Sequence, residues 1–123
     1  MYKNLDNLFF NLNKSKFRSS FHLNDDLKKY VNEKGMDTIK SHAYDFVNKK
    51  LKPAFPYNDG KQTAYKGHPV FVAQHATGTC CRGCLEKWHH IFKGKELTDI
   101  EVNYIVSVIM RWIENEMKIS FKK

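Results

Sequence analysis

Residues 98–113 read Thr-Asp-Ile-Glu-Val-Asn-Tyr-Ile-Val-Ser-Val-Ile-Met-Arg-Trp-Ile, and this stretch decides the fold class of the chain. Thr98 and Glu101 form a capping box, in which each side chain satisfies a backbone donor at the start of a helix. The residues that follow carry an apolar stripe at helical spacing, made of Ile105, Val108, Ile109, Trp112 and Ile113. The stretch therefore predicts an amphipathic helix whose apolar face packs in the core.

Upstream of this helix the sequence predicts further helices separated by turn residues. We expect helices over about residues 4–13, from the N-cap Asn24 to near Gly35, from there to Pro53, from Pro69 onward, and over residues 80–89. We expect a connector over 16–23 and a loop over 53–67, in which the turn signal at 58–60 is compatible with a short hairpin. Lys122 and Lys123 should fray. The predicted fold is a mostly α, small single-domain helical fold over residues 1–123, with an irregular central segment that carries a Cys/His cluster.

The composition points to a cytoplasmic protein. No apolar run approaches the ~18–20 residues that a membrane span needs, so we expect no membrane partner. The first residues lack the layout of a secretion signal. The chain has 3 cysteines, all within residues 80–84, which is typical of metal or redox chemistry rather than of a disulfide framework.

The net charge of +8 leaves two interpretations open. A basic surface attracts nucleic acid and other phosphate-bearing partners, because bound phosphates release counterions. However, 18 of the 21 basic residues are lysines spread along the chain, and a solvated Lys-rich surface explains them as well.

Residues 67–90 carry the densest set of metal-ligand side chains. Thiolates and imidazoles suit zinc, and Cys81-x-x-Cys84 has the short spacing with which one turn can hold a metal ion. His75 precedes the predicted helix on a flexible connection, whereas His89 lies five residues beyond Cys84 and would face away on an unbroken helix. The favoured ligand set is His75, Cys81 and Cys84, with Cys80 or His89 as the fourth ligand.

Two other interpretations of the thiols remain. They are inert and reduced, or they are redox-active. Cys81 at a helix start beside Arg82 is the thiol for which we expect a lowered pKa.

A second group of polar residues lies outside the cysteine segment. Residues 18–22 combine the Arg18 guanidinium, two hydroxyls and the His22 imidazole just before a helix, which predicts anion or substrate binding, although a polar connector accounts for them too. Asp59 and Lys61 form either a simple turn or the rim of a site.

Four strings in the sequence resemble one family. They are Lys-Phe-Arg-Ser-Ser-Phe-His-Leu at 16–23, Asn-Asp-Gly-Lys-Gln-Thr at 58–63, Gly-His-Pro-Val-Phe-Val-Ala-Gln-His-Ala-Thr at 67–77 and Cys-Cys-Arg-Gly-Cys-Leu-Glu-Lys-Trp-His at 80–89. From about Leu8 to Glu114 the chain resembles the bacterial family called domain of unknown function 4186. The family usually has Gly where this chain has His90, so the resemblance disfavours His90 as a ligand and leaves His89. The resemblance implies that the polar residues of these strings belong to motifs that line a pocket: Arg18, His22, Asp59, Lys61, His68 and His75.

Three functions follow as hypotheses, in this order. The first is a small zinc-binding protein that engages nucleic acid or another phosphate-bearing partner through its Lys-rich surface. The second is a zinc-dependent, hydrolase-like metalloenzyme in which His68, His89 or Asp59 is the general base. The third is a structural or interaction module with inert thiols.

Overall fold

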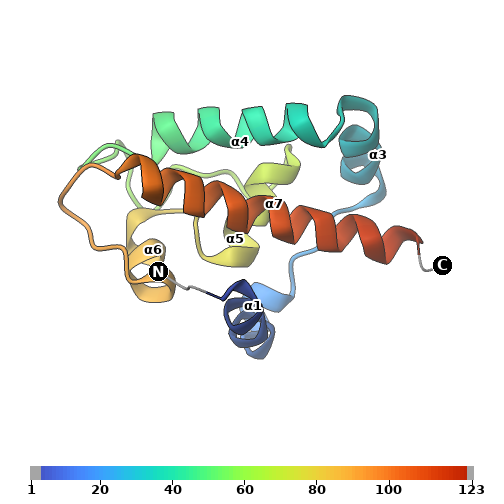
Figure 1. Cartoon of the computed structure of the whole chain (residues 1–123), viewed down its shortest axis with the longest axis horizontal. Helices are drawn as coiled ribbons and strands as arrows, with labels where there is room; N and C mark the ends of the chain where they lie inside the picture. The colour runs from blue at the N-terminus through green and yellow to red at the C-terminus, as the bar shows by residue number, and fades with distance from the viewer. Residues whose placement is uncertain (1–3, 122–123) are drawn as a thin grey trace.

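The computed structural model describes residues 4–121, and within them every regular element is a helix. The helices are α1 (Leu5–Lys14), α2 (Lys16–Ser19), α3 (Asp25–Lys34), α4 (Met36–Lys50), α5 (Pro69–Thr77), α6 (Arg82–His89) and α7 (Asp99–Phe121) (Figure 1). The mostly α prediction is confirmed. Residues 53–67 form an irregular loop without the hairpin strands that the turn signal allowed, and the predicted connector contains the single turn of α2. Lys122 and Lys123, for which fraying was predicted, lie outside the described residues.

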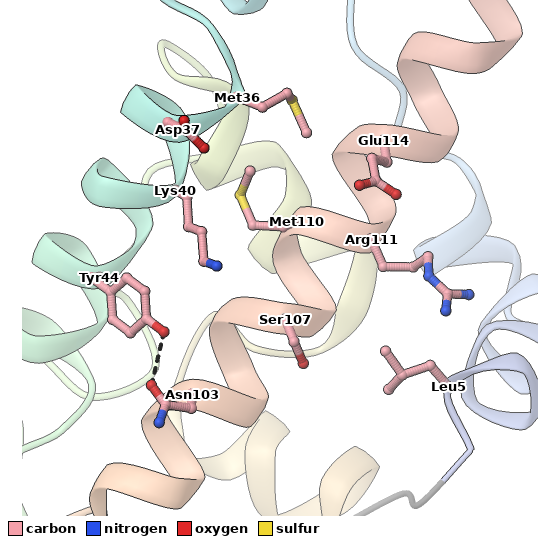
Figure 2. A pocket seen from close by; sticks show the side chains of 10 residues that line it. All are labelled: Leu5, Met36, Asp37, Lys40, Tyr44, Asn103, Ser107, Met110, Arg111 and Glu114. Carbon is pink, nitrogen blue, oxygen red and sulfur yellow. Dashed lines mark hydrogen bonds between the residues drawn. The ribbon is translucent and has the colours of Figure 1, made fainter.

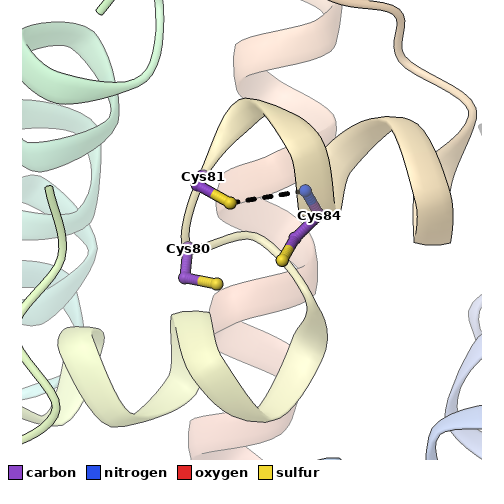
Figure 3. Close-up of side chains that lie close together, drawn as sticks. All are labelled: Cys80, Cys81 and Cys84. Carbon is purple, nitrogen blue, oxygen red and sulfur yellow. Dashed lines mark hydrogen bonds between the residues drawn. The ribbon is translucent and has the colours of Figure 1, made fainter. Parts of the chain in front are cut away.

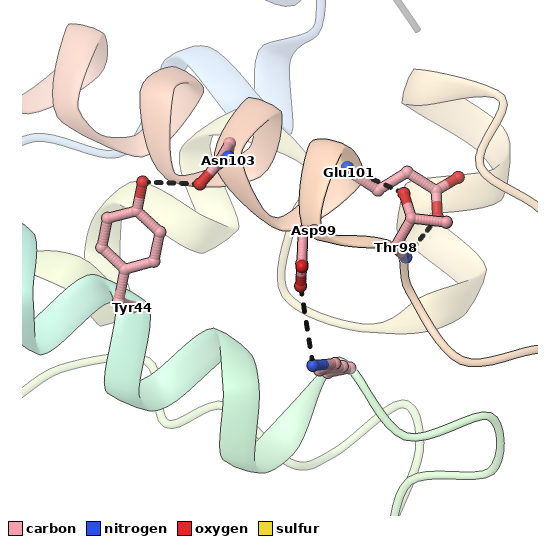
Figure 4. A network of polar contacts seen from close by, with 6 residues as sticks. Tyr44, Thr98, Asp99, Glu101 and Asn103 are labelled. Atoms are coloured by element: carbon pink, nitrogen blue, oxygen red, sulfur yellow. Dashed lines mark hydrogen bonds and ion pairs between the residues drawn. The ribbon is translucent and has the colours of Figure 1, made fainter.

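The capping box predicted from the sequence starts α7. The Thr98 N–H donates to Glu101 Oε1 at 2.9 Å, and the Glu101 N–H donates to Thr98 Oγ1 at 3.1 Å (Figure 4). Just beyond this start, Tyr44 on α4 donates its hydroxyl to Asn103 Oδ1 at 2.8 Å. The Tyr44–Asn103 bond joins α4 to the first half of α7.

Side-chain caps also define α3 and α5. Asn24 accepts a hydrogen bond from the Leu27 N–H at 2.8 Å, as its predicted N-cap role requires. His68 caps α5, because its Nδ1 accepts from the Val70 N–H at 3.0 Å. Gly78 ends α5 in the left-handed region at φ +72°, a conformation that residues with a Cβ seldom adopt.

The main core lies where α5 is covered by α4 and α7 (Figure 1). Fully buried aliphatic side chains come from all three helices and include Ile39, Ala43, Val47, Val70, Ala73, Ile105, Ile109 and Ile113. A smaller cluster joins α1 to α7 through Leu8, Leu12 and Val108. The cysteines lie outside both clusters, so the apolar core does not depend on them.

A groove of about 460 Å³ opens between α4 and α7, with Leu5 of α1 at one side (Figure 2). Two cations and two carboxylates line it, namely Lys40, Arg111, Asp37 and Glu114. None of the candidate site residues lines this groove. No helix in the described range 4–121 combines the length and the apolar composition that crossing a membrane requires.

Candidate metal centre

The three cysteines meet at the junction between α5 and α6. Cys80 and Cys81 lie in the short connection 78–81, and Cys84 lies in the first turn of α6. Their Sγ atoms all lie within 4.8 Å of one another (Figure 3). Among the residues that the structure describes, this is the one group of three or more His, Cys, Asp or Glu side chains that could hold a metal ion.

The start of α6 differs from the prediction of a helix over 80–89. Cys81 is extended at φ −158° and ψ 169°, and its Sγ accepts a hydrogen bond from the Cys84 N–H at 3.4 Å. Cys81 is therefore the N-cap of α6, and the helix begins at Arg82. Its sulfur still faces that of Cys84, because a cap side chain folds back over the first turn.

Arg18 of α2 lies against the sulfurs. Its Nη2 donates to Cys84 Sγ at 3.2 Å, and its Nη1 donates to the His75 carbonyl at 2.7 Å with a longer contact of 3.8 Å to Cys80 Sγ. The Ser15 hydroxyl caps α2 by accepting from the Arg18 N–H, which holds this turn in place. Arg18 is only 9% exposed, so its charge is placed in a largely dry environment next to the thiols.

Cys84 is the cysteine whose pKa is lowered. Hydrogen bonds from Cys80 and Cys81 lower the pKa of Cys84 far below its ordinary value, and the hydrogen bond from Arg18 lowers it further. The pKa of Cys80 is raised, because Cys80 shares hydrogen bonds with the sulfurs of Cys81 and Cys84 and is buried. The cluster thus lowers the pKa of Cys84 and raises the pKa values of Cys80 and Cys81, and the Arg18 guanidinium lies against Cys84.

The prediction that Cys81 has the lowered pKa was wrong. The hydrogen bond with Cys80 lowers the pKa of Cys81, but the interaction with Cys84 and burial outweigh it and the net shift is upward. Arg82 contributes nothing here because its guanidinium points elsewhere. It is fully buried and donates to four carbonyls, those of Leu51, Pro53, Phe92 and Lys95, at 2.7–3.3 Å.

His75 lies at the end of α5 next to the cluster, and one of its ring nitrogens has a partner on the loop. Its Nε2 lies 3.1 Å from the Thr63 carbonyl, which can only accept, so Nε2 carries the hydrogen. The ring stacks on Tyr65 with centroids 3.9 Å apart. Burial lowers the pKa of His75, which keeps the imidazole neutral. His75 does not belong to the group whose ligand atoms lie within 4.8 Å of one another.

His89 is fully buried one helix turn beyond the cluster. Its Nε2 lies 2.8 Å from the Thr77 carbonyl, and its Nδ1 lies 2.8 Å from the Tyr104 hydroxyl. Burial lowers the pKa of His89 to about 4. Both ring nitrogens are directed at groups other than the sulfurs, so His89 acts as a bridge between α5, α6 and α7.

Arg18 and His22, predicted from the sequence to act together, line one cavity of about 230 Å³. The carboxylate of Glu116 on α7 shares this cavity and is 5% exposed. Glu116 Oε2 lies 3.1 Å from His22 Nδ1, and its Oε1 accepts the Leu23 N–H at 2.9 Å. Sequence reasoning missed Glu116, although it falls one helical turn after Trp112 on the apolar stripe of α7, where a carboxylate is unexpected.

The other three predicted residues lie elsewhere. Asp59 Oδ1 accepts from the Arg82 N–H at 3.0 Å and thus adds a second cap to α6. Lys61 lines a separate hollow at the end of α4. His68 Nε2 lies 3.0 Å from His42 Nδ1, and burial lowers the pKa of His68 to about 4. These three residues do not line the cavity that Arg18 and His22 share.

The sulfurs fit a tetrahedral thiophilic ion. Zinc bonds sulfur at about 2.3 Å, so tetrahedral thiolates lie about 3.8 Å apart, and sulfurs within 4.8 Å need only a small inward adjustment. Three cysteines fill three of the four positions.

A family model for a domain of unknown function, DUF4186, matches residues 6–114 of the chain. No solved structure matches the chain. The match spans α1 and most of α7, so the cysteine junction and all the polar motifs lie inside it.

Proposed function

Since the chain belongs to the DUF4186 family, whose description names no activity, we propose a function from the site itself: the protein binds a zinc ion through Cys80, Cys81 and Cys84 and leaves its fourth position open to water or to a ligand. The observation that supports this proposal most strongly is the convergence of three sulfurs without a histidine in the group. A site with three protein ligands and one open position is the arrangement of exchangeable or catalytic zinc, whereas structural zinc is closed by four.

Charge balance supports a divalent ion. Three thiolates and a divalent ion leave a net charge of −1, and the buried guanidinium of Arg18 beside Cys84 and Cys80 neutralises it. A trivalent ion would form a neutral complex and leave Arg18 buried without a counter-charge, which is unfavourable. Soft thiolate ligands select zinc among the abundant divalent ions.

The test is the metal content of tag-free protein by plasma mass spectrometry. We expect about one zinc per chain, lost in Cys81→Ser and Cys84→Ser and retained in His75→Gln. Retention in His75→Gln separates an open site from one closed by that imidazole. Metal-free wild-type protein purified without chelator would overturn the proposal.

Cobalt substitution then tests the open position. The visible spectrum of Co²⁺ bound to the three thiolates should change when azide or imidazole is added, because either can enter the fourth position. A spectrum that does not respond to added ligands would show a closed site.

A zinc-dependent hydrolase is the second candidate, and it depends on the same open position. Of the three side chains considered as general base, Asp59 alone is hydrogen-bonded to the segment that bears the cysteines, through the Arg82 N–H. His68 and His89 direct their nitrogens at other partners. The candidate requires zinc-loaded protein to cleave nitrophenyl esters or phosphodiesters, and the Asp59→Asn variant to lose that activity while keeping its metal.

A further inference from the structure

The loop 53–67 holds two aromatic side chains almost entirely in solvent. Phe55 is 84% exposed and Tyr57 is 88% exposed. Large aromatic rings dominate buried area when they pack, so rings left outside the core mark an interaction surface when they lie together. Two such rings, two residues apart on one loop, call for a partner with flat apolar faces.

Three lysines gather beside Tyr57, the second of these rings. A hollow of about 420 Å³ is lined by Lys49 and Lys50 from the last turn of α4 and by Lys61 from the loop, together with Tyr57, Asn58 and Gln62. No carboxylate lines it. Lys50 Nζ lies 3.4 Å from the Gln62 carbonyl, so its ammonium group is held at the wall of the hollow. The hollow therefore presents positive charge beside an exposed aromatic ring.

Hydrogen bonds fix the shape of this surface. The Gln62 side chain accepts from the Gly60 N–H at 2.8 Å and donates to Asp59 Oδ1 at 3.0 Å. Asp59 in turn caps α6, and the Thr63 hydroxyl donates to the Cys80 carbonyl at 2.8 Å. The loop is thus anchored on both sides of Lys61, and less conformational entropy is lost when a partner binds.

We propose that the hollow and the two exposed rings bind single-stranded nucleic acid. The lysines contact successive phosphates while Tyr57 and Phe55 stack on unpaired bases, the combination by which proteins bind single strands without sequence preference. A duplex hides the base faces that the rings need. The three cations are lysines and not arginines. The surface therefore lacks the planar guanidinium groups that form paired hydrogen bonds with base edges and so distinguish sequences.

The measurement is fluorescence anisotropy of labelled 12-nucleotide oligo(dT) and oligo(rU) with the full chain. We expect binding of one or both, and their ratio reports whether DNA or RNA is preferred. With three phosphate contacts, the logarithm of the association constant should fall with the logarithm of salt with a slope of about −2. The Tyr57→Ala variant should weaken binding about 5- to 150-fold, since one stacked base is lost.

Two triple variants that remove the same charge distinguish binding at this surface from attraction by the net charge of the protein. Replacing Lys49, Lys50 and Lys61 with Gln should reduce the salt slope to near zero. Replacing Lys28, Lys29 and Lys34 with Gln removes the same charge from α3, at the opposite end of α4 (Figure 1), and should leave most of the slope. Equal losses in the two triple variants would overturn the proposal, provided circular dichroism shows both folded.

Two further outcomes decide against a single-strand site. Duplex bound as tightly as single strand, or inorganic polyphosphate bound as tightly with no effect of Tyr57→Ala, would each overturn the proposal. The surface does not use the cysteine sulfurs, so oligonucleotide binding is expected in both zinc-loaded and chelator-treated protein. If the protein binds no zinc, the proposal of single-stranded nucleic-acid binding is therefore unaffected. If it binds no oligonucleotide, the zinc proposal is likewise unaffected.

Discussion

Arg18 sets the charge balance of the cysteine cluster, and its replacement tests that role. We expect Arg18→Gln to weaken zinc binding about 10- to 100-fold, because a hydrogen-bonded partner behind the ligands is lost and the complex keeps a net negative charge. Arg18→Lys should recover part of the loss. Competition with a chromogenic chelator measures the affinity.

The control for Arg18 is Arg111→Gln, which removes the same charge from an exposed pair with Asp6 at 3.2 Å. It should leave zinc affinity unchanged. Equal affinity in Arg18→Gln and wild-type protein would show that the guanidinium has no part in metal binding.

His89 gives the folded protein a defined response to acid. Burial lowers the pKa of His89 to about 4. Between pH 6.5 and 4 the imidazole is therefore protonated in the unfolded chain but stays neutral in the folded chain. The free energy of unfolding therefore has its full value above pH 6.5. It decreases as the pH falls from 6.5 to 4, by on the order of 3 kcal/mol. Urea unfolding of chelator-treated protein at pH 7 and pH 4.5 measures the decline.

The matched variants for this effect are His89→Gln and His90→Asn. Gln keeps hydrogen-bonding capacity at the buried position without titrating, so His89→Gln should be less stable at pH 7 but change less with pH. His90 is exposed and contributes less than burial to the lowered pKa of His89, so His90→Asn should retain most of the wild-type pH dependence. An unchanged pH dependence in His89→Gln would contradict the assignment.

At the level of single residues the sequence identified the three cysteines but not the side chains that support them. Arg82 looked like an ordinary helix cation, and nothing in its neighbourhood signals that its guanidinium binds four carbonyls from two distant loops. Such a role depends on tertiary structure alone. Glu116, by contrast, could have been identified from the sequence, because a carboxylate within the apolar stripe of a helix indicates a buried polar contact.

Among the elements, the junction between α5 and α6 is the one most sensitive to substitution. A Cβ at Gly78 would lie 2.8 Å from Cγ and Cδ1 of Trp88, and the backbone there has φ +72°. We expect Gly78→Ala to lower the free energy of unfolding by about 2–4 kcal/mol, from the left-handed backbone and the overlap together. Chemical denaturation measures the change.

A double-mutant cycle with Trp88→Ala separates the two causes. In the Trp88→Ala background the contacts with Cγ and Cδ1 are removed and only Cβ remains, at 3.0 Å, so Gly78→Ala should cost only about 1 kcal/mol there. Strictly additive effects would mean that the indole moves aside freely and that backbone strain is the whole cost.

Helices with ordinary caps could be predicted from the sequence, and the helix with an unusual cap could not. The boundaries near Asn24, Gly35 and Thr98 follow from side chains that commonly end helices, and the structure confirms them. The start of α6 was placed two residues too early, because a cysteine is seldom an N-cap and Cys81 occupies that position. The thiol with the lowered pKa was misassigned for a different reason, because the guanidinium next to the sulfurs is that of Arg18, which donates to Cys84, and not that of Arg82.

For the whole molecule, the separation of the core from the cysteines predicts that the fold does not depend on the zinc ion proposed for them. The main cluster comes mostly from α4, α5 and α7, with Val31 of α3 and Leu85 of α6, and contains none of the three cysteines. Chelator treatment should leave the far-ultraviolet helix signal at 25 °C unchanged. It should also lower the melting temperature relative to zinc-loaded protein, and this difference should grow as the free zinc concentration of the loaded sample rises above the dissociation constant. Circular dichroism with and without chelator provides both values. Loss of helix signal on zinc removal would show that the metal is required for folding.

The buried arginine at position 82 also determines where the chain can be cut. Its guanidinium holds the Lys95 carbonyl at 2.8 Å, so the peptide bond after Lys95 cannot leave the surface to enter a protease. Lys66 and Gly67 are both exposed on the loop, and no bond described in the structure anchors the carbonyl of Lys66. Trypsin should therefore nick the native protein first after Lys66. The two pieces should remain together after the nick, since α4 from one and α5 and α7 from the other share the same core.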